Sequence, residues 1–173
     1  VYGRRVGAAI ADYVSDRPAP QFDEAAYAIA ARQNLQTWLD RSGHYRIADV
    51  RQAFQDAMTQ YCGVFRTADL MRQGLAVTAT LLDQADDLHL DDRGTYWNSE
   101  LIEALELKNL MIVGRAILTS ALNRQESRGA HCREDFPDRD DTQFLQHTLA
   151  TYRGPTSSAV SYTHLRAHET VLD

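Results

Sequence analysis

Residues 99–125, SELIEALELKNLMIVGRAILTSALNRQ, form a long helical pattern with no internal breaker. Asn98, immediately before it, is a typical N-cap residue, because its side-chain oxygen can accept a hydrogen bond from an amide of the first turn. Large apolar residues recur on more than one side of this predicted helix. Since a helix that is apolar on two sides is buried between two partners, the stretch predicts the central helix of an all-α domain.

Three shorter helical patterns precede this stretch. The first is expected after the N-cap Asp23 and ends at Ser42–Gly43, the second ends at Gly63, and the third begins after the N-cap Thr67. Their expected inner faces consist of Ala28, Ala31, Leu35, Trp38 and Leu39, then Ile47, Val50, Phe54, Met58 and Tyr61, then Leu70, Gly74, Val77, Leu81, Ala85 and Leu88.

No strand-like alternation is convincing, and short connections between helices favour antiparallel neighbours. The sequence therefore predicts a three- to four-helix bundle, followed by an extended charged segment. The second apolar face of the 99–125 helix indicates that a further element packs against it.

The composition is 44% hydrophobic and 24% charged, and no apolar run approaches the roughly 18 residues that a membrane span needs. Two cysteines, Cys62 and Cys132, cannot form a disulfide framework and indicate a reducing compartment. A net charge of −6 argues against nonspecific nucleic-acid binding, which needs a cationic surface. Lys108 is the only lysine, so the cationic side chains are almost all arginines.

The two ends differ in character from the middle. Residues 1–16 show a helical pattern of small and apolar residues, and the sequence supplies no preceding element for this helix to pack on. We therefore expect them to be the end of an upstream domain, which the breaker Pro18–Pro20 separates from the helical domain. Residues 160–173 resemble a peptide translated from sequencing-adapter DNA. We expect this tail to be non-native and exclude its histidines, His164 and His168, from site reasoning.

Residues 124–141 carry four arginines, six acidic residues and one histidine. Gly129 suits a left-handed turn that would end the long helix. His131 and Cys132 are adjacent and lack zinc-ligand spacing, Ser127 lacks a nucleophile elbow, and Glu126, Glu134 and Asp135 are generic carboxylates. Two interpretations of this segment remain: a solvated run of charges, or an ion-pair segment docked on another domain. In a buried pair the loss of one partner costs several times more free energy than in an exposed pair.

The same segment carries a family resemblance. Residues 126–141, ESRGAHCREDFPDRDD, with FLQHTL at 144–149, are similar to the C-terminal signature of succinate dehydrogenase and fumarate reductase flavoprotein subunits. The similarity extends back through EALELKNL at 103–110 and CGVFRT at 62–67 to YGRR at 2–5. L-Aspartate oxidases share the ESRG core and the histidine two residues after it, but Arg139-Asp140-Asp141 and His147-Thr148-Leu149 favour the respiratory enzymes.

This resemblance implies a parent protein that binds FAD in an N-terminal domain, closes a capping domain over a C4 dicarboxylate and transfers hydride between succinate and the flavin. It also implies an iron–sulfur subunit and, through it, a membrane anchor, at the cytoplasmic face of the bacterial inner membrane. The family's catalytic and FAD-binding residues all lie upstream of Val1. We therefore expect no catalytic, cofactor-binding or metal residue in this chain, which by itself would be inactive.

Three segments follow from the resemblance: the last helix of the FAD domain at 1–16, a C-terminal helical domain at 21–153, and the non-native tail at 160–173. We expect the charged segment 124–141 to pin the helical domain against the FAD domain. The candidate docking residues are Arg124, Glu126, Arg128, His131, Arg133 and Asp135. The alternatives are a free-standing helical interaction module and the C-terminal part of an L-aspartate oxidase.

Overall fold

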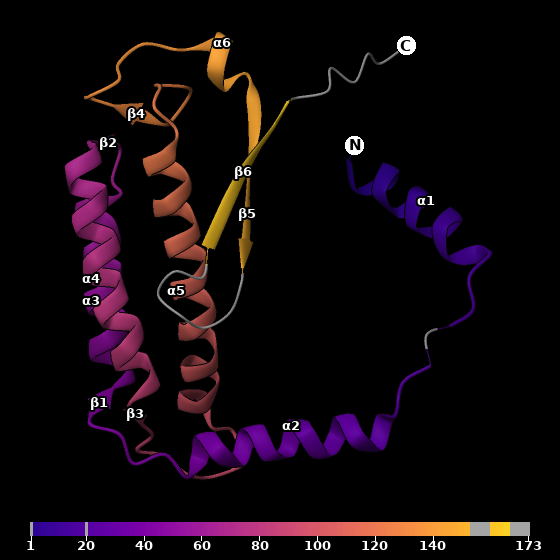
Figure 1. Cartoon of the computed structure of the whole chain (residues 1–173). Coiled ribbons are helices and arrows are strands. Elements are labelled where there is room, and N and C mark those ends of the chain that lie inside the picture. The colour runs from indigo at the N-terminus through magenta and orange to yellow at the C-terminus, as the bar shows by residue number, and fades with distance from the viewer. Residues whose placement is uncertain (1, 20, 153–159, 167–173) are drawn as a thin grey trace. The chain divides into compact units, whose positions relative to one another are not determined.

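The computed structural model describes residues 2–19 and 21–152, and the backbone of 160–166 (Figure 1). The chain divides into two compact units, Val1–Thr37 and Trp38–Asp173. The predicted all-α class is confirmed, because most described residues lie in helices. Among the described residues, no helix is both long and apolar enough to span a bilayer.

The first unit consists of α1 (Tyr2–Ser15) and most of α2 (Glu24–Leu39). Asp23 caps α2 as predicted, since its carboxylate accepts a hydrogen bond from the amide of Ala26 at 3.0 Å. The predicted inner face of α2 is confirmed only at its end, where Trp38 and Leu39 are buried; Ala28, Ala31 and Leu35 are exposed. The end of α2 belongs to the second unit, and its buried pair joins the core there.

The second unit is organised around three helices that pack on one another, α3 (Ile47–Tyr61), α4 (Ala68–Asp86) and α5 (Ser99–Asn123). Thr67 caps α4 through the amide of Leu70 at 3.3 Å, and Asn98 caps α5 through the amide of Leu101 at 2.7 Å, as the sequence predicts. The main core includes Val50 and Phe54 of α3, Leu81 and Ala85 of α4, and Ala104, Leu107 and Met111 of α5.

The buried face of α4 is rotated from the predicted one. Met71, Thr78 and Leu82 are buried beside Gly74, Leu81 and Ala85, whereas Val77 is exposed. Leu88 is buried, but it lies in strand β3 (Leu88–His89) beyond the end of the helix. Gly74, which lies on both the predicted and the observed face, packs closely against Tyr61 and Leu118.

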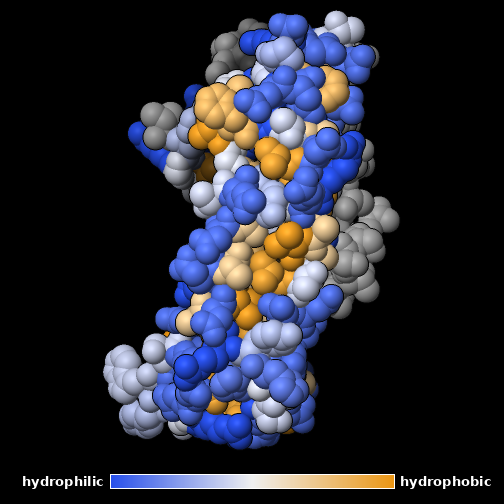
Figure 2. Space-filling view, turned by 90° about the vertical axis from the view of Figure 1, so that its left-hand side faces the viewer, coloured by the Kyte–Doolittle hydropathy of each residue, from blue (hydrophilic) through white to orange (hydrophobic). Residues whose placement is uncertain are grey.

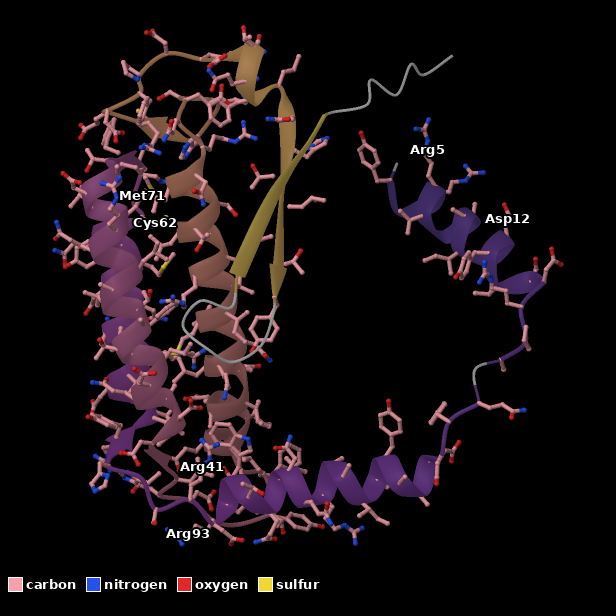
Figure 3. The ribbon with its side chains drawn as sticks, viewed as in Figure 1. Arg5, Asp12, Arg41, Cys62, Met71 and Arg93 are labelled. Atoms are coloured by element: carbon pink, nitrogen blue, oxygen red, sulfur yellow. The ribbon has the colours of Figure 1, made fainter. Side chains whose placement is uncertain are left out.

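A second apolar cluster lies where α4 begins and α5 ends. It contains Met71, Leu118 and Ala121, with Cys62 packed against it, and Figure 3 shows Met71 and Cys62 together at this end of the helices. At the opposite end, Arg93 donates to the carbonyl of Arg41 at 3.3 Å (Figure 3). On the face formed by α3 and α4, hydrophobic residues gather midway along the helices between hydrophilic ends (Figure 2).

Short strands tie the helix ends together. Strand β1 (Tyr45–Arg46) pairs in parallel with β3, and β2 (Phe65–Arg66) pairs in parallel with β4 (Cys132–Arg133). After the short helix α6 (Asp141–Phe144), β5 (Gln146–Tyr152) pairs antiparallel with β6 (Val160–Arg166). In Figure 1, β5 and β6 run alongside α5.

Gly129 has the predicted left-handed conformation, with φ of 58°, but it does not end the long helix. Helix α5 stops at Asn123, and Gly129 lies in a tight turn whose flanking residues, Arg128 and His131, exchange backbone hydrogen bonds. The extended segment that we expected after the helix is therefore a folded loop held by β4.

Candidate functional site

Arg133 occupies the C-terminal end of α5. It is 1% exposed, and its Nη1 donates to the carbonyls of Ala121, Leu122 and Arg124 at 3.1, 3.1 and 2.9 Å. The last carbonyls of a helix have no partner within it and carry partial negative charge. The guanidinium therefore satisfies these carbonyls and complements the helix dipole.

The other edge of Arg133 binds Asp135, with Nε and Nη2 donating to the two carboxylate oxygens at 2.7 and 2.8 Å. The same carboxylate accepts the amide of Ala68, the first residue of α4, at 2.8 Å. The Arg133 hydrogen bonds are the main cause that lowers the pKa of Asp135 to about 2, against an opposing effect of burial. This pair thus links the end of α5 to the start of α4.

Glu126 is fully buried and is the centre of a second set of bonds. Its carboxylate accepts from Arg124, from Nε and Nη2 of Arg128 at 2.7 and 2.9 Å, and from the amide of Asp140 at 2.9 Å. Burial alone would raise the pKa of Glu126, but the hydrogen bonds from Arg128, Asp140 and Arg124 outweigh it and bring the pKa to about 2. Glu126 is therefore ionised at neutral pH and holds two guanidinium groups.

The network continues into α6 and β5. Arg128 also binds Asp141 at 2.6 Å, and Arg139 binds the same carboxylate at 2.7 Å. Arg124 donates to the carbonyls of Phe144 at 2.9 Å and Gln146 at 2.6 Å. The charged segment thus anchors the chain that follows it onto the end of α5.

His131 joins this segment to β2. Nη1 of Arg66 lies 3.0 Å from Nδ1 of His131, and Nε2 lies 3.2 Å from the carbonyl of Arg124. Because a guanidinium only donates and a carbonyl only accepts, the geometry assigns a neutral imidazole with its proton on Nε2. Burial lowers the pKa of His131 and the carbonyl hydrogen bond opposes this, while Arg66, Arg133 and Arg124 lower the pKa further.

The nucleophile candidates have structural roles in this arrangement. The hydroxyl of Ser127 donates to the carbonyl of Phe136 at 2.9 Å and accepts the amide of Arg133 at 2.8 Å, which fixes the loop. Burial raises the pKa of the Cys62 thiol, with Arg66 opposing, so this cysteine is not an activated thiolate. Within residues 2–19 and 21–152, no group of three or more His, Cys, Asp or Glu side chains is placed to hold a metal ion.

A groove of about 820 Å³ runs along α5 beside β5, and we call it the α5 groove. Apolar residues of α5 line one part of it, and the charged network lines the other through Arg66, Arg124, Arg128 and His131. The apolar side chains that line the groove include Ile112, Val113, Ala116, Ile117, Leu145 and Tyr152.

All six predicted docking residues lie in one connected network, which sequence reasoning alone could not establish. Glu126 and Arg133 are buried within the second unit, so any effect of these two on docking would act through their neighbours. Docking on another domain stays a prediction. Sequence reasoning did not identify Arg66 as a member of this network. Arg66 lies in the CGVFRT stretch at 62–67, which was noted only for its family resemblance, and its partner His131 is 65 residues away.

The sequence has no glycine-rich phosphate-binding loop. The guanidinium groups of Arg124, Arg128 and Arg133 contact carboxylates of this chain.

Comparison with known proteins agrees with this architecture. The family model described as "Fumarate reductase flavoprotein C-term" matches residues 51–172. The succinate dehydrogenase flavoprotein subunit of Rickettsia bellii is 41% identical over 109 residues, covering 63% of this chain and 18% of the relative. The fumarate reductase flavoprotein subunit of Mycobacterium tuberculosis is 36% identical over 169 residues, covering 94% of this chain and 29% of the relative.

Solved structures show the same fold. The FrdA chain of an E. coli quinol fumarate reductase mutant superposes with a TM-score of 0.80 at 30% identity, covering 90% of this chain and 27% of that one. The adenylylsulfate reductase of Archaeoglobus fulgidus, with a TM-score of 0.67 at 18% identity, shares the fold alone.

Fold and sequence together define a helical domain of the kind that matches the C-terminal part of flavoprotein subunits. The family match spans most of the chain and includes the charged segment. The chain belongs to the fumarate reductase flavoprotein C-terminal family, whose matching relatives are succinate dehydrogenase and fumarate reductase flavoprotein subunits. It spans between 18% and 29% of the length of the relatives described above.

Proposed function

We propose that this chain is the C-terminal helical domain of a flavoprotein subunit that interconverts succinate and fumarate. The parent subunit would use FAD, bound by its upstream part, as hydride acceptor or donor. The domain itself would contribute packing against the FAD domain and assembly of the subunit. Its match to the C-terminal part of relatives with these two activities carries the proposal.

The partners and location follow from the same proposal. The parent subunit would pass electrons to an iron–sulfur subunit and, through it, to a membrane anchor, at the cytoplasmic face of the bacterial inner membrane. The similarity to a quinol fumarate reductase supports an assembly of this kind.

The geometry of the charged segment is consistent with a packing role. Its pairs are largely satisfied within the second unit, so the segment forms a rigid end on the three helices. A rigid, preorganised surface loses little side-chain entropy when another domain docks on it. The side chains of Arg128 and Asp135 remain 27% and 28% exposed and could contact that domain directly.

A chimeric subunit tests this function. The upstream part of the Mycobacterium tuberculosis fumarate reductase flavoprotein subunit would be joined to this chain, in place of the region aligned with it. We expect the purified chimera to retain flavin and to oxidise succinate with an artificial electron acceptor. A chimera that binds no flavin, or that is inactive with both succinate and fumarate, would refute the proposal that this chain serves as the C-terminal domain of such a subunit.

Charge reversal of Arg128 tests the docking role of the segment. Because Arg128 also binds Glu126 and Asp141, the variant Arg128→Glu must be compared in the isolated chain and in the chimera. We expect Arg128→Glu to lower the flavin content of the chimera by a larger fraction than it lowers the folded fraction of the isolated chain. Unchanged flavin retention would refute docking through this residue.

A further inference from the structure

The α5 groove has two chemically different ends. Along α5 its lining proceeds from Ile112, Val113 and Ile117 to Ser120 and Arg124, so the apolar part lies midway along the helix and the basic part at its end. Val113 and Ile117 are 58% and 47% exposed, which is unusual for aliphatic side chains on adjacent turns of a core helix.

Arg66 is the distinctive group at the basic end. Its Nε donates to the carbonyl of Gly63 at 2.7 Å and its Nη1 to His131 at 3.0 Å. Within residues 2–19 and 21–152, no carboxylate lies within ion-pair distance of it. Arg124, Arg128 and Arg133, by contrast, each contact a carboxylate.

Among the residues that the structure describes, no group compensates the charge of Arg66. Its hydrogen-bonded neighbour His131 is neutral, and Glu126 is already shared by Arg124 and Arg128. A partly buried guanidinium next to apolar surface is stabilised when a carboxylate approaches its planar edge, and Nη2 makes no hydrogen bond to the described residues. The basic end of the groove therefore suits one carboxylate, and its apolar part suits aliphatic side chains.

We propose that a segment of the parent subunit upstream of this domain covers the α5 groove and brings an Asp or Glu carboxylate onto Arg66. This inference rests on the proposed function. Two observations favour such an occupant: the charge of Arg66, which no carboxylate of the described residues compensates, and relatives in which most of the chain lies outside the matched region. Aliphatic residues of the segment would pack against Val113 and Ile117.

Carbodiimide cross-linking of the flavin-loaded chimera tests the contact. In the variant Arg66→Lys, the introduced amine would form an amide with a carboxylate that it touches, and peptide mass spectrometry would locate the bond. Lys108 is the only native lysine of this chain and lies 2.8 Å from Asp86, so it supplies an internal positive control. The matched variant Arg72→Lys has Asp69 as its neighbour and should cross-link only there.

We expect position 66 to cross-link to an Asp or Glu of the upstream part. A chimera that holds flavin, but in which position 66 links only within this chain or not at all while Lys108 reacts, would overturn the inference and leave the proposed function standing. A chimera that binds no flavin would instead count against the proposed function.

A second experiment does not require the lysine side chain at position 66 to touch the carboxylate. Arg66→Gln should lower the thermal midpoint of flavin release from the chimera by several degrees more than it lowers the unfolding midpoint of the isolated chain, whereas Arg72→Gln should change neither. Equal shifts for Arg66→Gln in the two proteins would overturn the inference.

Discussion

The guanidinium of Arg133 and the carboxylate of Asp135 form a bidentate ion pair whose two ends satisfy two different helices. Arg133 caps the carbonyls at the end of α5, and Asp135 accepts the first amide of α4. Each charge has the sign that its helix end favours. The pair therefore fixes the relative position of the two helices that frame the second core cluster.

Removing the guanidinium should destabilise the second unit strongly. Arg133→Gln removes the guanidinium that donates to three helix-end carbonyls and to the Asp135 carboxylate, which keeps the Ala68 amide, and breaking a buried pair in this way costs about 3–5 kcal/mol. Urea unfolding followed by circular dichroism measures the loss. Arg72→Gln, which removes an exposed pair on α4, should cost less than about 0.5 kcal/mol. A cost for Arg133→Gln as small as the control would contradict the capping role.

Acid should weaken the fold between about pH 4.5 and pH 2. The pKa values of Glu126 and Asp135 fall from 4.5 and 3.8 to about 2 on folding, so the unfolded chain binds more protons in this range. Stability is then fully present above the unfolded pKa values and is lost as the pH falls through the folded ones. Urea midpoints measured across this range should decline steeply.

Glu126→Gln should flatten that decline and lower the stability at neutral pH, since the neutral amide cannot hold two guanidinium groups as strongly. Glu103→Gln, at a half-exposed carboxylate 3.6 Å from Arg51, is the matched control and should keep the wild-type profile. A Glu126→Gln profile identical to that of the control would show that Glu126 does not govern the acid response.

His131 should titrate below its usual pKa, and Arg66 should be part of the reason. Its depressed pKa means that the folded state gains stability above the unfolded value near 6.5 and loses it as the pH falls through the folded value. Arg66→Gln removes a cation and a donor to Nδ1, so the His131 pKa should rise. Two-dimensional NMR of the imidazole resonances measures it, and an unchanged pKa would refute the Arg66 contact. Arg72→Gln should leave this pKa as it is in the wild type.

Gly74 should tolerate no side chain. A Cβ there would lie 2.6 Å from Cβ of Tyr61 and 3.2 Å from Cδ2 of Leu118. Overpacking of this kind costs about 1–3 kcal/mol, against a gain of roughly 1 kcal/mol in helix propensity. Gly74→Ala should therefore give a net loss in urea unfolding. Gly7→Ala, in α1 with nothing within 4 Å, should leave unfolding of the second unit unchanged. A stabilised Gly74→Ala variant would show that α3 and α4 can separate at low cost.

Much of the helical framework was predictable because its signals are local. Thr67 and Asn98 cap their helices as expected, and α5 shows the predicted apolar residues on both a buried and an exposed side. A cap involves residues three apart, and a stripe repeats every three or four residues, so both can be recognised without tertiary information.

The features that could not be predicted depend on distant pairs. The two-residue strands β2 and β4 are too short to show a period, and they are recognisable only because the fold pairs Phe65–Arg66 with Cys132–Arg133, far away in the sequence. The same pairing brings Arg66 to His131. Which residues of α4 are buried depends on its packing against both α3 and α5, which is a property of several helices rather than of one pattern.

The flavin content of three purified proteins shows whether this chain completes a flavoprotein subunit. We expect no flavin on the 173-residue chain alone, a low flavin-to-protein ratio on the upstream part of the Mycobacterium tuberculosis relative alone, and a ratio near one on the chimera that joins them. Stoichiometric flavin on this chain alone, or a chimera that retains no more flavin than the upstream part does, would contradict this expectation.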